Sequence, residues 1–473
     1  MESIFGRNQQ IDIFNEAMAS GQSEFITVVG RRRVGKTFLI NTFFKEDICF
    51  YMTGVQNQPM KTQLRAFANE LGNRQKKIVS TPEGWLEAFF ILRDYVETVE
   101  TTKKKVIFFD ELAWMDTPRS NFLQLFAHFW NSWAAWEKNI ILVIAGSSTS
   151  WIVNKVYKDR GGLHNRVTKR IWLEPFKLGE TEAFFKSKNI TFSRYDIALL
   201  YMAFGGVPFY LNEVKSGESV AQCIDRLCFT EGGLLQDEFD NLYASIFSNP
   251  ESHVKIVKTL AQHHYGMERN DLLKQAKITN SGTATKILEE LVATGYVYYM
   301  VPFGKNANNG KYILADFYSR FYLTFISNRK ISNWMGQIDN NVYKTWCGLS
   351  FEWLCHYHKK QITKALGISG IQTSTSYFNV KDETGKMTAQ IDMLIDRADN
   401  VLNLCEIKFS NDVYTLSKAE ADNIRKKTFY LQGQLKRRKS IFPTMITTFG
   451  CEKNMYYLGV ITHQVDMDCL FVE

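Results

Sequence analysis

The residues with the clearest chemistry lie near the start of the chain, where positions 30–37 read Gly-Arg-Arg-Arg-Val-Gly-Lys-Thr. This matches the GxxxxGK[ST] pattern of a P-loop, in which backbone N–H groups surround the phosphates of a nucleotide. Lys36 would reach the β and γ phosphates, and the Thr37 hydroxyl would bind Mg²⁺. An apolar run at 25–29 and a helix-like stretch at 38–44 flank the pattern. We therefore expect ATP and Mg²⁺ as cofactors, with Gly30, Val34, Gly35, Lys36 and Thr37 as nucleotide-binding residues.

A second motif of the same kind follows at 106–111, where an apolar run ends in Asp110 and Glu111. In parallel sheets buried on both faces, the C-terminal ends of the strands face the ligand. Asp110 would hold Mg²⁺ together with Thr37, and Glu111 would orient and deprotonate the attacking water. The alternative is a strand that ends in a solvated acidic turn. The P-loop pattern earlier in the chain disfavours it.

A third apolar run, at 139–145, ends in Gly146, Ser147 and Ser148. Either serine would be placed to donate a hydrogen bond to the γ phosphate, and Ser147 is our candidate for this nucleotide-binding role. Small polar residues also end many ordinary strands. Both interpretations therefore stay open.

The last third of the chain carries a separate group of charged residues. Asp392 lies in a strand-like run at 390–395, after the turn-rich segment 381–386, and Glu406 follows fourteen residues later, in Glu-Ile-Lys. Alternation along a strand places Glu406 and Lys408 on one face, opposite Asp392 on the adjacent strand. Asp392 and Glu406 would bind Mg²⁺, and Lys408 would act catalytically by activating water for attack on a phosphodiester.

Between these two groups the pattern is that of a winged helix. Helix-like segments at 254–261, 271–276 and 281–294 precede strand-like runs at 296–300 and 311–314. The third helix begins with small polar residues that suit a DNA major groove, and Lys305 and Lys311 would lie near phosphates. The alternative is a packing and relay module without DNA contact.

Together these motifs resemble the archaeal-type P-loop ATPases of the STAND/AAA+ class, which carry a winged helix and a C-terminal PD-(D/E)xK-like, or restriction-endonuclease-like, domain. Phe5-Gly6-Arg7 is similar to the family's GRxxE element, and the resemblance places Arg7 beside the adenine. Gln10 stands where the family usually has an acidic residue, which weakens any role for that position.

The resemblance extends to three further elements. The stretch 161–168 resembles the family's GR-T segment, which implies that Arg166 senses phosphate in cis or from a neighbouring subunit. Gly206-Val207-Pro208 resembles the GxP element, whose proline packs near the adenine in a helical lid. The segment 348–352 resembles the first helix of the nuclease-like domain, which adds Glu352 as a metal ligand.

The composition sets limits on the class of protein. The 473 residues are 45% hydrophobic and 22% charged, which is typical of a globular chain with several domains. No apolar run approaches the ~20 residues of a membrane span, and the N-terminus lacks the features of a signal peptide, so we expect a cytoplasmic location and no membrane partner. The eight cysteines form no CxxC pair, which argues against zinc. The net charge of +8 is compatible with binding to polyanions or with an ordinary solvated surface.

We therefore expect an α/β protein with four domains. These are a P-loop ATPase core (1–176), a helical lid (177–250), a winged helix (251–315) and a nuclease-like domain (316–473). The predicted function is Mg²⁺-dependent ATP binding and hydrolysis coupled to DNA binding and DNA cleavage. The alternative is an ATP-driven signalling or scaffold switch whose nuclease-like domain binds a partner without cutting. A homo-oligomer is compatible with either function.

Overall fold

The computed structural model describes the chain apart from residues 1–3, 159–160, 248, 328–332, 339, 382–386 and 473. The segment 382–386, which belongs to the expected turn, thus lies outside the described residues. The chain divides into two compact units. The first comprises Met1–Pro175 with Ile246–Ser248, and the second comprises Phe176–Ser245 with Asn249–Glu473.

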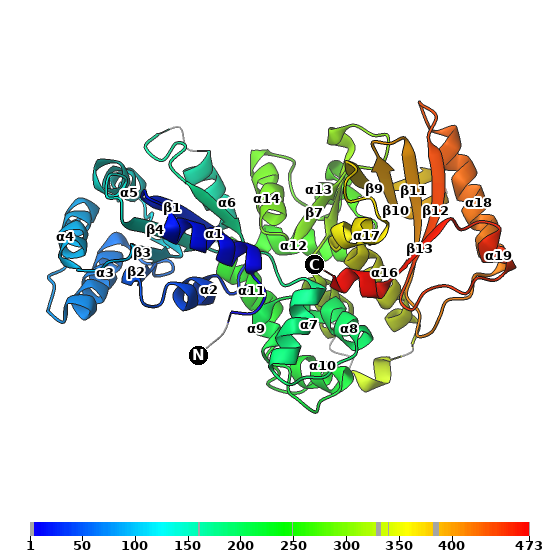
Figure 1. Ribbon diagram of the computed structural model, residues 1–473, viewed down its shortest axis with the longest axis horizontal. Helices are drawn as coiled ribbons and strands as arrows, with labels where there is room; N and C mark the ends of the chain where they lie inside the picture. Colours follow the sequence, from blue (N-terminus) through cyan, green and yellow to red (C-terminus); the bar gives the residue numbers. More distant parts are fainter. Residues whose placement is uncertain are drawn as a thin grey trace. The chain divides into compact units, whose positions relative to one another are not determined.

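The first unit is built around a five-stranded sheet in the order β2-β3-β4-β1-β5, and every neighbouring pair of strands is parallel (Figure 1). Strands β1, β3 and β4 are buried along most of their length because separate hydrophobic clusters cover the two faces of the sheet. This explains why these three strands read as continuous apolar runs. Their bounds are Glu24–Val29 (β1), Ile48–Thr53 (β2), Lys105–Asp110 (β3), Ile140–Gly146 (β4) and Lys169–Trp172 (β5).

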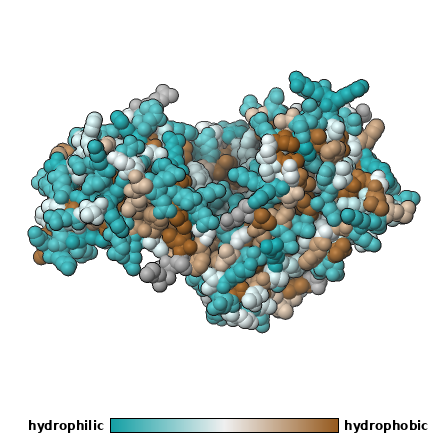
Figure 2. All heavy atoms as spheres, in the orientation of Figure 1, coloured by the Kyte–Doolittle hydropathy of each residue, from teal (hydrophilic) through white to brown (hydrophobic). Residues whose placement is uncertain are grey.

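Helices cover both faces of this sheet by burying one apolar stripe each. Phe14 and Ala17 of α1 join one hydrophobic cluster, and Trp85 and Leu92 of α4 join the other. Hydrophilic side chains cover most of the visible face of this unit (Figure 2). The main helices are Asn8–Ala19 (α1), Lys36–Phe43 (α2), Met60–Gln75 (α3), Trp85–Thr98 (α4), Phe122–Phe129 (α5) and Thr149–Ile152 (α6).

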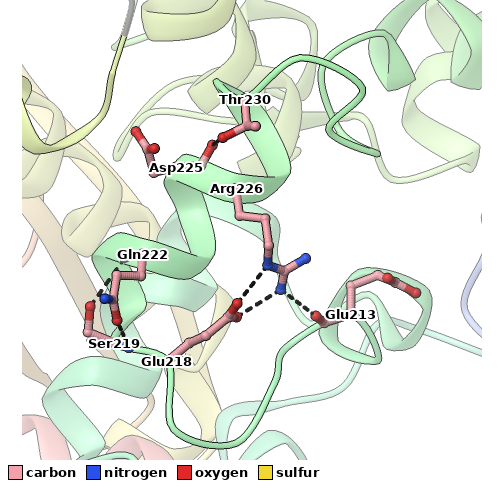
Figure 3. Close-up of polar contacts among 7 residues, drawn as sticks. All are labelled: Glu213, Glu218, Ser219, Gln222, Asp225, Arg226 and Thr230. Carbon is pink, nitrogen blue, oxygen red and sulfur yellow. Dashed lines mark hydrogen bonds and ion pairs between the residues drawn. The ribbon is translucent and has the colours of Figure 1, made fainter.

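The second unit begins with helices, as the apolar spacing from 177 onward predicts. They are Leu178–Ser187 (α7), Arg194–Phe204 (α8), Pro208–Leu211 (α9), Val220–Cys228 (α10) and Glu238–Ile246 (α11). Figure 3 shows how polar contacts fix α10: Ser219 and Gln222 form a capping box at its start. Arg226 donates to both carboxylate oxygens of Glu218, at 2.7 and 2.8 Å, and to the Glu213 carbonyl (Figure 3).

The middle of this unit has three helices and a small antiparallel sheet in the order β6-β8-β7. The expected helix starts and ends differ from the observed ones by up to three residues. The elements are Glu251–Ala261 (α12), Met267–Glu268 (β6), Arg269–Gln275 (α13), Gly282–Ala293 (α14), Val297–Met300 (β7) and Lys311–Leu314 (β8).

The C-terminal part contains a second five-stranded sheet, in the order β13-β12-β11-β10-β9. Neighbours are antiparallel from β9 to β11 and parallel from β11 to β13, with α18 connecting β11 to β12. The strands are Thr373–Lys381 (β9), Met387–Arg397 (β10), Val401–Lys408 (β11), Ser440–Thr447 (β12) and His463–Asp466 (β13). The helices are Phe317–Phe321 (α15), Asn341–Tyr357 (α16), Lys359–Ala365 (α17), Lys418–Gly433 (α18) and Met455–Leu458 (α19).

Two features bear on the class of protein. Within the described ranges, no helix combines the length and apolar character needed to cross a membrane. All eight cysteines lie in described parts of the chain, and no disulfide joins them.

The close approach at Gly206 generates a stability prediction. A Cβ at this position would lie 1.9 Å from the Phe176 carbonyl oxygen, so Gly206→Ala must displace backbone. We expect a loss of about 1–3 kcal/mol, which lowers the thermal transition by roughly 2–4 °C per kcal/mol. Gly282→Ala is the control, because its Cβ meets nothing within 4 Å. Differential scanning calorimetry would contradict this account if both variants melted alike.

Candidate functional sites

The P-loop occupies the turn between β1 and α2. Gly30 is required there because a Cβ would lie 2.2 Å from the Leu173 carbonyl oxygen, and Gly35 has a left-handed φ of 88°. The Lys36 ammonium is buried and donates to the carbonyls of Gly30 and Arg31, at 2.9 and 3.0 Å. Burial lowers the pKa of Lys36, and the nearby carboxylates of Glu111 and Asp110 oppose this shift.

The predicted magnesium ligands meet at the start of α2 and the end of β3. The Thr37 hydroxyl donates to Asp110 Oδ2 at 2.5 Å, and Asp110 Oδ1 accepts from the Glu111 N–H at 2.9 Å. Burial is the main reason why the pKa of Asp110 is raised. A hydroxyl and a carboxylate in contact at the P-loop form the donor set that Mg²⁺ takes in such proteins, so these residues fit the ion.

Glu111 is held in an unusual conformation by the end of β4. Its φ is 46°, in the left-handed region that glutamate rarely adopts. Its carboxylate accepts two backbone contacts from the Ser147 N–H, at 3.1 and 3.2 Å, and one from the Ser147 hydroxyl, at 3.0 Å. The serine expected to contact phosphate thus donates to the predicted catalytic glutamate. Ser148 instead precedes the first residue of α6.

Arg7 braces the P-loop from outside. The buried Arg7 side chain donates to the carbonyls of Val34 and Glu174, at 3.2 and 2.8 Å. Val34, within the loop, buries its side chain in the hydrophobic core, so only its backbone is available to a nucleotide.

The structure gives the position of Arg166 relative to the sheet. This exposed residue precedes β5, and β5 runs parallel to β1 with Lys169 beside Ile26. Because the P-loop follows the other end of β1, Arg166 lies toward the sheet edge opposite the P-loop of its own chain. Its role in sensing phosphate stays a prediction, and this position favours a neighbouring subunit over the same chain.

Pro208 is the first residue of α9 and belongs to the second unit. The preceding turn needs glycine, because Gly205 has a φ of 67° and Gly206 lies against the Phe176 backbone. The Phe176 N–H donates to the Gly206 carbonyl at 2.7 Å, which fixes the start of α9.

The C-terminal carboxylates come from three elements: α16 carries Glu352, β10 carries Asp392, and β11 carries Glu406 and Lys408. Pairing of Met393 with Cys405 places Asp392 across from Glu406, as the strand alternation predicts. Asp392 Oδ2 also accepts from the Ile407 N–H at 3.1 Å.

The electrostatics of these carboxylates are strongly perturbed. Burial, then repulsion from Asp392, raises the pKa of Glu352 to about 8 and that of Glu406 to about 7. Burial also raises the pKa of Asp392. Each side chain is therefore held in a position where a cation would be favourable.

Sequence reasoning missed Lys427, whose ammonium lies 2.5 Å from Glu406 Oε1 in a buried ion pair. The signal was present, because Lys427 occupies a position on the apolar stripe of α18 between Ile424 and Leu431. Charged residues are almost never fully buried unless they are paired.

A small pocket of about 50 Å³ opens beside Glu352 and Asp392, and Tyr265 and Arg320 also line it. Burial lowers the pKa of Arg320 to about 10. Burial raises the pKa of Tyr265, and the nearby carboxylates of Glu352 and Asp392 raise it further. These neighbours come from distant parts of the chain, which the sequence pattern did not connect.

Two histidines at the C-terminal end of α16 form hydrogen bonds within the fold. His356 Nε2 donates to the Asp392 carbonyl at 2.9 Å, and burial lowers the pKa of His356 to about 4. His358 Nε2 accepts from the Leu178 N–H at 3.1 Å. Both histidines are hydrogen-bonded, and His358 is fully buried.

The expectation of one three-carboxylate metal centre needs correction. Over the described residues, no group of three or more His, Cys, Asp or Glu is arranged to hold a metal ion. Glu406 is instead engaged by Lys427, and the pair Asp392 and Glu406 is the remaining candidate ligand set. Mg²⁺ is often held by one or two carboxylates together with waters and substrate phosphates, so two ligands suffice chemically.

Comparison with known proteins concerns the N-terminal part of the chain. Residues 4–214 match the model of an ATPase domain found predominantly in Archaea. An uncharacterized protein of Methanocaldococcus jannaschii is 25% identical over 325 residues, which cover 68% of each chain. Residues 4–214 are thus similar to an archaeal-type ATPase domain.

Solved structures add a fold comparison. The Walker-type ATPase of Pyrococcus abyssi has a TM-score of 0.51 and 18% identity, covering 68% of this chain and 96% of that one. The ORC2 protein of Aeropyrum pernix, in ADPNP–ADP complexes, has a TM-score of 0.42 and 12% identity, covering 69% and 93%. The first similarity supports a shared α/β fold.

The buried carboxylates generate a pH prediction. The pKa values of Glu352 and Glu406, about 8 and about 7, exceed the ~4.3 of an unfolded glutamate. The folded protein thus binds more protons than the unfolded chain between about pH 5 and pH 8, so its stability falls as pH rises through this window. Calorimetry in EDTA should show the transition temperature falling as the pH is raised from 5 to 8. In a parallel series with Mg²⁺ in place of EDTA, the transition temperature should recover most near pH 8.

Glu352→Gln removes one of these groups and should flatten the pH dependence. Glu289→Gln, a change at an exposed glutamate of α14, is the matched control. Identical pH profiles for the two variants would be incompatible with a buried titrating cluster.

Proposed function

We propose that the protein is a Mg²⁺-dependent ATPase that couples nucleotide binding and hydrolysis to DNA binding and to metal-dependent DNA cleavage by its C-terminal domain. The observation that carries the proposal is the hydrogen-bonded series from Thr37 through Asp110 and Glu111 to Ser147. It gathers a metal-binding pair and an oriented base at the end of the P-loop.

Each residue has a defined task in hydrolysis. Thr37 and Asp110 would hold Mg²⁺, which neutralises charge on the β and γ phosphates when bound. Lys36 compensates the same charge from the P-loop side. Glu111 accepts a proton from the attacking water as its oxygen bonds to the γ phosphorus, and the bond to the bridging oxygen of ADP breaks. Ser147 keeps Glu111 oriented for this step.

Arg166 contributes to a neighbouring copy in this proposal. It is exposed at the sheet edge opposite its own P-loop, where a second subunit would bring its γ phosphate. An arginine supplied in trans stabilises transition-state charge in related phosphoryl transfers. The active form would then be a homo-oligomer, with Arg7 near the adenine as the family resemblance implies.

The second unit acts on DNA in this proposal. Residues 251–315 form a winged helix, and residues 316–473 form a nuclease-like domain around the mixed sheet and α16. Asp392 and Glu406 would hold Mg²⁺ with the scissile phosphate, and Lys408, at the end of β11, would position the attacking water. The raised pKa values of the two carboxylates support a cation there.

A second candidate function is favoured by one specific observation. Lys427 already neutralises Glu406 in a buried ion pair. A domain in which an internal cation takes the place of a metal would bind a partner without cutting it. ATP would then drive a signalling or scaffold switch.

The ATPase proposal predicts distinct losses for two changes. Lys36→Ala should abolish ATP binding because it removes phosphate charge compensation. Glu111→Gln should retain binding but slow hydrolysis on the order of 10²–10⁴-fold, because it removes the base. Isothermal titration calorimetry and phosphate release measure the two effects. Lys61→Ala, at an exposed lysine of α3, should change neither. Nucleotide affinity unchanged by Lys36→Ala would rule out the P-loop assignment.

The nuclease proposal predicts that Asp392→Asn or Glu406→Gln abolishes cleavage. ATP hydrolysis should be unaffected, because independent sites behave additively. Lys408→Ala should keep metal binding and lose rate. Plasmid and single-stranded DNA are incubated with Mg²⁺ or Mn²⁺, with and without ATP. Cleavage that survives Asp392→Asn, or no cleavage by the parent protein, would leave the switch function.

A further inference from the structure

A groove of about 1480 Å³ lies within the second unit, between the middle segment and the C-terminal sheet. Its walls come from α13, the loop between β7 and β8, strand β9 and the loop that follows α18. None of the residues proposed for ATP hydrolysis lines it. The groove therefore needs a separate explanation.

The groove is basic. Seven lysine or arginine side chains and three aspartate or glutamate side chains line it. One of the three acids, Asp396, is ion-paired with Lys439 inside the groove. The uncompensated positive charge favours a polyanion over an acidic or neutral small molecule, because it is spread along a long, open surface.

Five of the basic side chains are exposed and come from three separate parts of the chain. They are Lys274 and Lys277 on and after α13, Lys305 in the β7–β8 loop, and Lys436 and Arg437 after α18. Within the described part of the chain, none of these five forms an ion pair with an acidic side chain. A solvated helix face would place its charges on one helix. Here the exposed charges come from three segments that meet on one surface.

The two walls of the groove are fastened to each other. The Phe303 N–H, in the β7–β8 loop, donates to the Tyr377 carbonyl of β9 at 3.0 Å. The Phe303 ring packs against Phe378, with 6.4 Å between ring centroids. The basic side chains are thus presented by backbone that is held in place, which lowers the cost of ordering them around a ligand.

The groove lies next to the carboxylate pocket. Asn379 of β9 lines both. The short segment between α12 and β6 borders both as well, because His263 and Gly266 line the groove while His264 and Tyr265 line the pocket. A nucleic acid in the groove would therefore lie next to the pocket that Glu352 and Asp392 line.

The exposed face of α14, the helix expected to enter a DNA major groove, is less suited to a polyanion. Lys286 stands beside Glu289 and Glu290, and its ammonium lies 3.9 Å from Glu290 Oε1. Arg269, which precedes this helix, donates to Thr285 and Asn280. Charge complementarity favours the groove over α14.

We propose that this groove binds the phosphodiester backbone of a nucleic acid and directs it to the carboxylate pocket. Delivery of the nucleic acid to the carboxylate pocket rests on the proposed function, whereas binding in the groove does not. Contacts to the backbone position a nucleic acid without reading its sequence, so the groove should accept many sequences.

The test is a binding titration of the full chain in EDTA, where cleavage cannot interfere. Fluorescence anisotropy is measured with a labelled DNA duplex and with the matching RNA duplex, at several salt concentrations. The groove variant combines Lys277→Ala, Lys305→Ala, Lys436→Ala and Arg437→Ala. The matched control removes the same charge outside the groove, by Lys344→Ala, Lys360→Ala, Lys418→Ala and Lys453→Ala, all at exposed lysines of the same unit.

The groove variant should bind on the order of 100-fold more weakly at low salt, with its logarithmic salt slope reduced by about 3–4, while the control stays close to the parent. The two duplexes show whether DNA or RNA is preferred. Equal losses in both variants, or no binding by the parent at low salt, would overturn the proposal. Unchanged ATP hydrolysis and thermal transition confirm that both variants are folded. Binding without cleavage would overturn only the nuclease part of the proposed function.

Discussion

The candidate nucleotide site depends on the register of three parallel strands. Val29 of β1 pairs with Gly146 of β4, and Phe109 of β3 pairs with Ile144. The three strands therefore end at one level, where the P-loop, the acidic pair and Ser147 meet. A slip by one residue would turn the Asp110 side chain to the other face and separate it from Thr37. The hydrophobic clusters on both faces fix this register, so packing far from the phosphates positions the polar residues.

The second candidate site depends on a different constraint, which is the cost of burying charge. Burial, then repulsion from Asp392, raises the pKa of Glu352 and of Glu406, and the buried ammonium of Lys427 partly offsets the rise at Glu406. Removing one member of such a pair is strongly destabilising because the other charge is left uncompensated. Lys427 is therefore a structural partner of Glu406 as much as a neighbour of the proposed metal.

Much of the fold could be predicted because local sequence patterns decide it. Apolar runs with charged or glycine-rich ends predicted β1, β3 and β4 within one residue, and the spacing of Asp392 and Glu406 together with strand alternation assigned these two residues to facing strands. The misses have a common cause. Partners such as Lys427 and Tyr265 approach the carboxylates only through tertiary packing, which spacing along the chain does not encode. The position of Arg166 likewise required the direction of β5 relative to β1.

The contact between Ser147 and Glu111 has a consequence for how the first site distinguishes its ligands. A serine hydroxyl carries a single proton, and here that proton is committed to a carboxylate. It can serve a phosphate oxygen only by leaving Glu111, which would then be held by the backbone N–H alone. The Glu111 carboxylate and a phosphate oxygen thus compete for one donor. A γ phosphate that takes the Ser147 hydroxyl would leave the Glu111 side chain less restrained than it is without that phosphate.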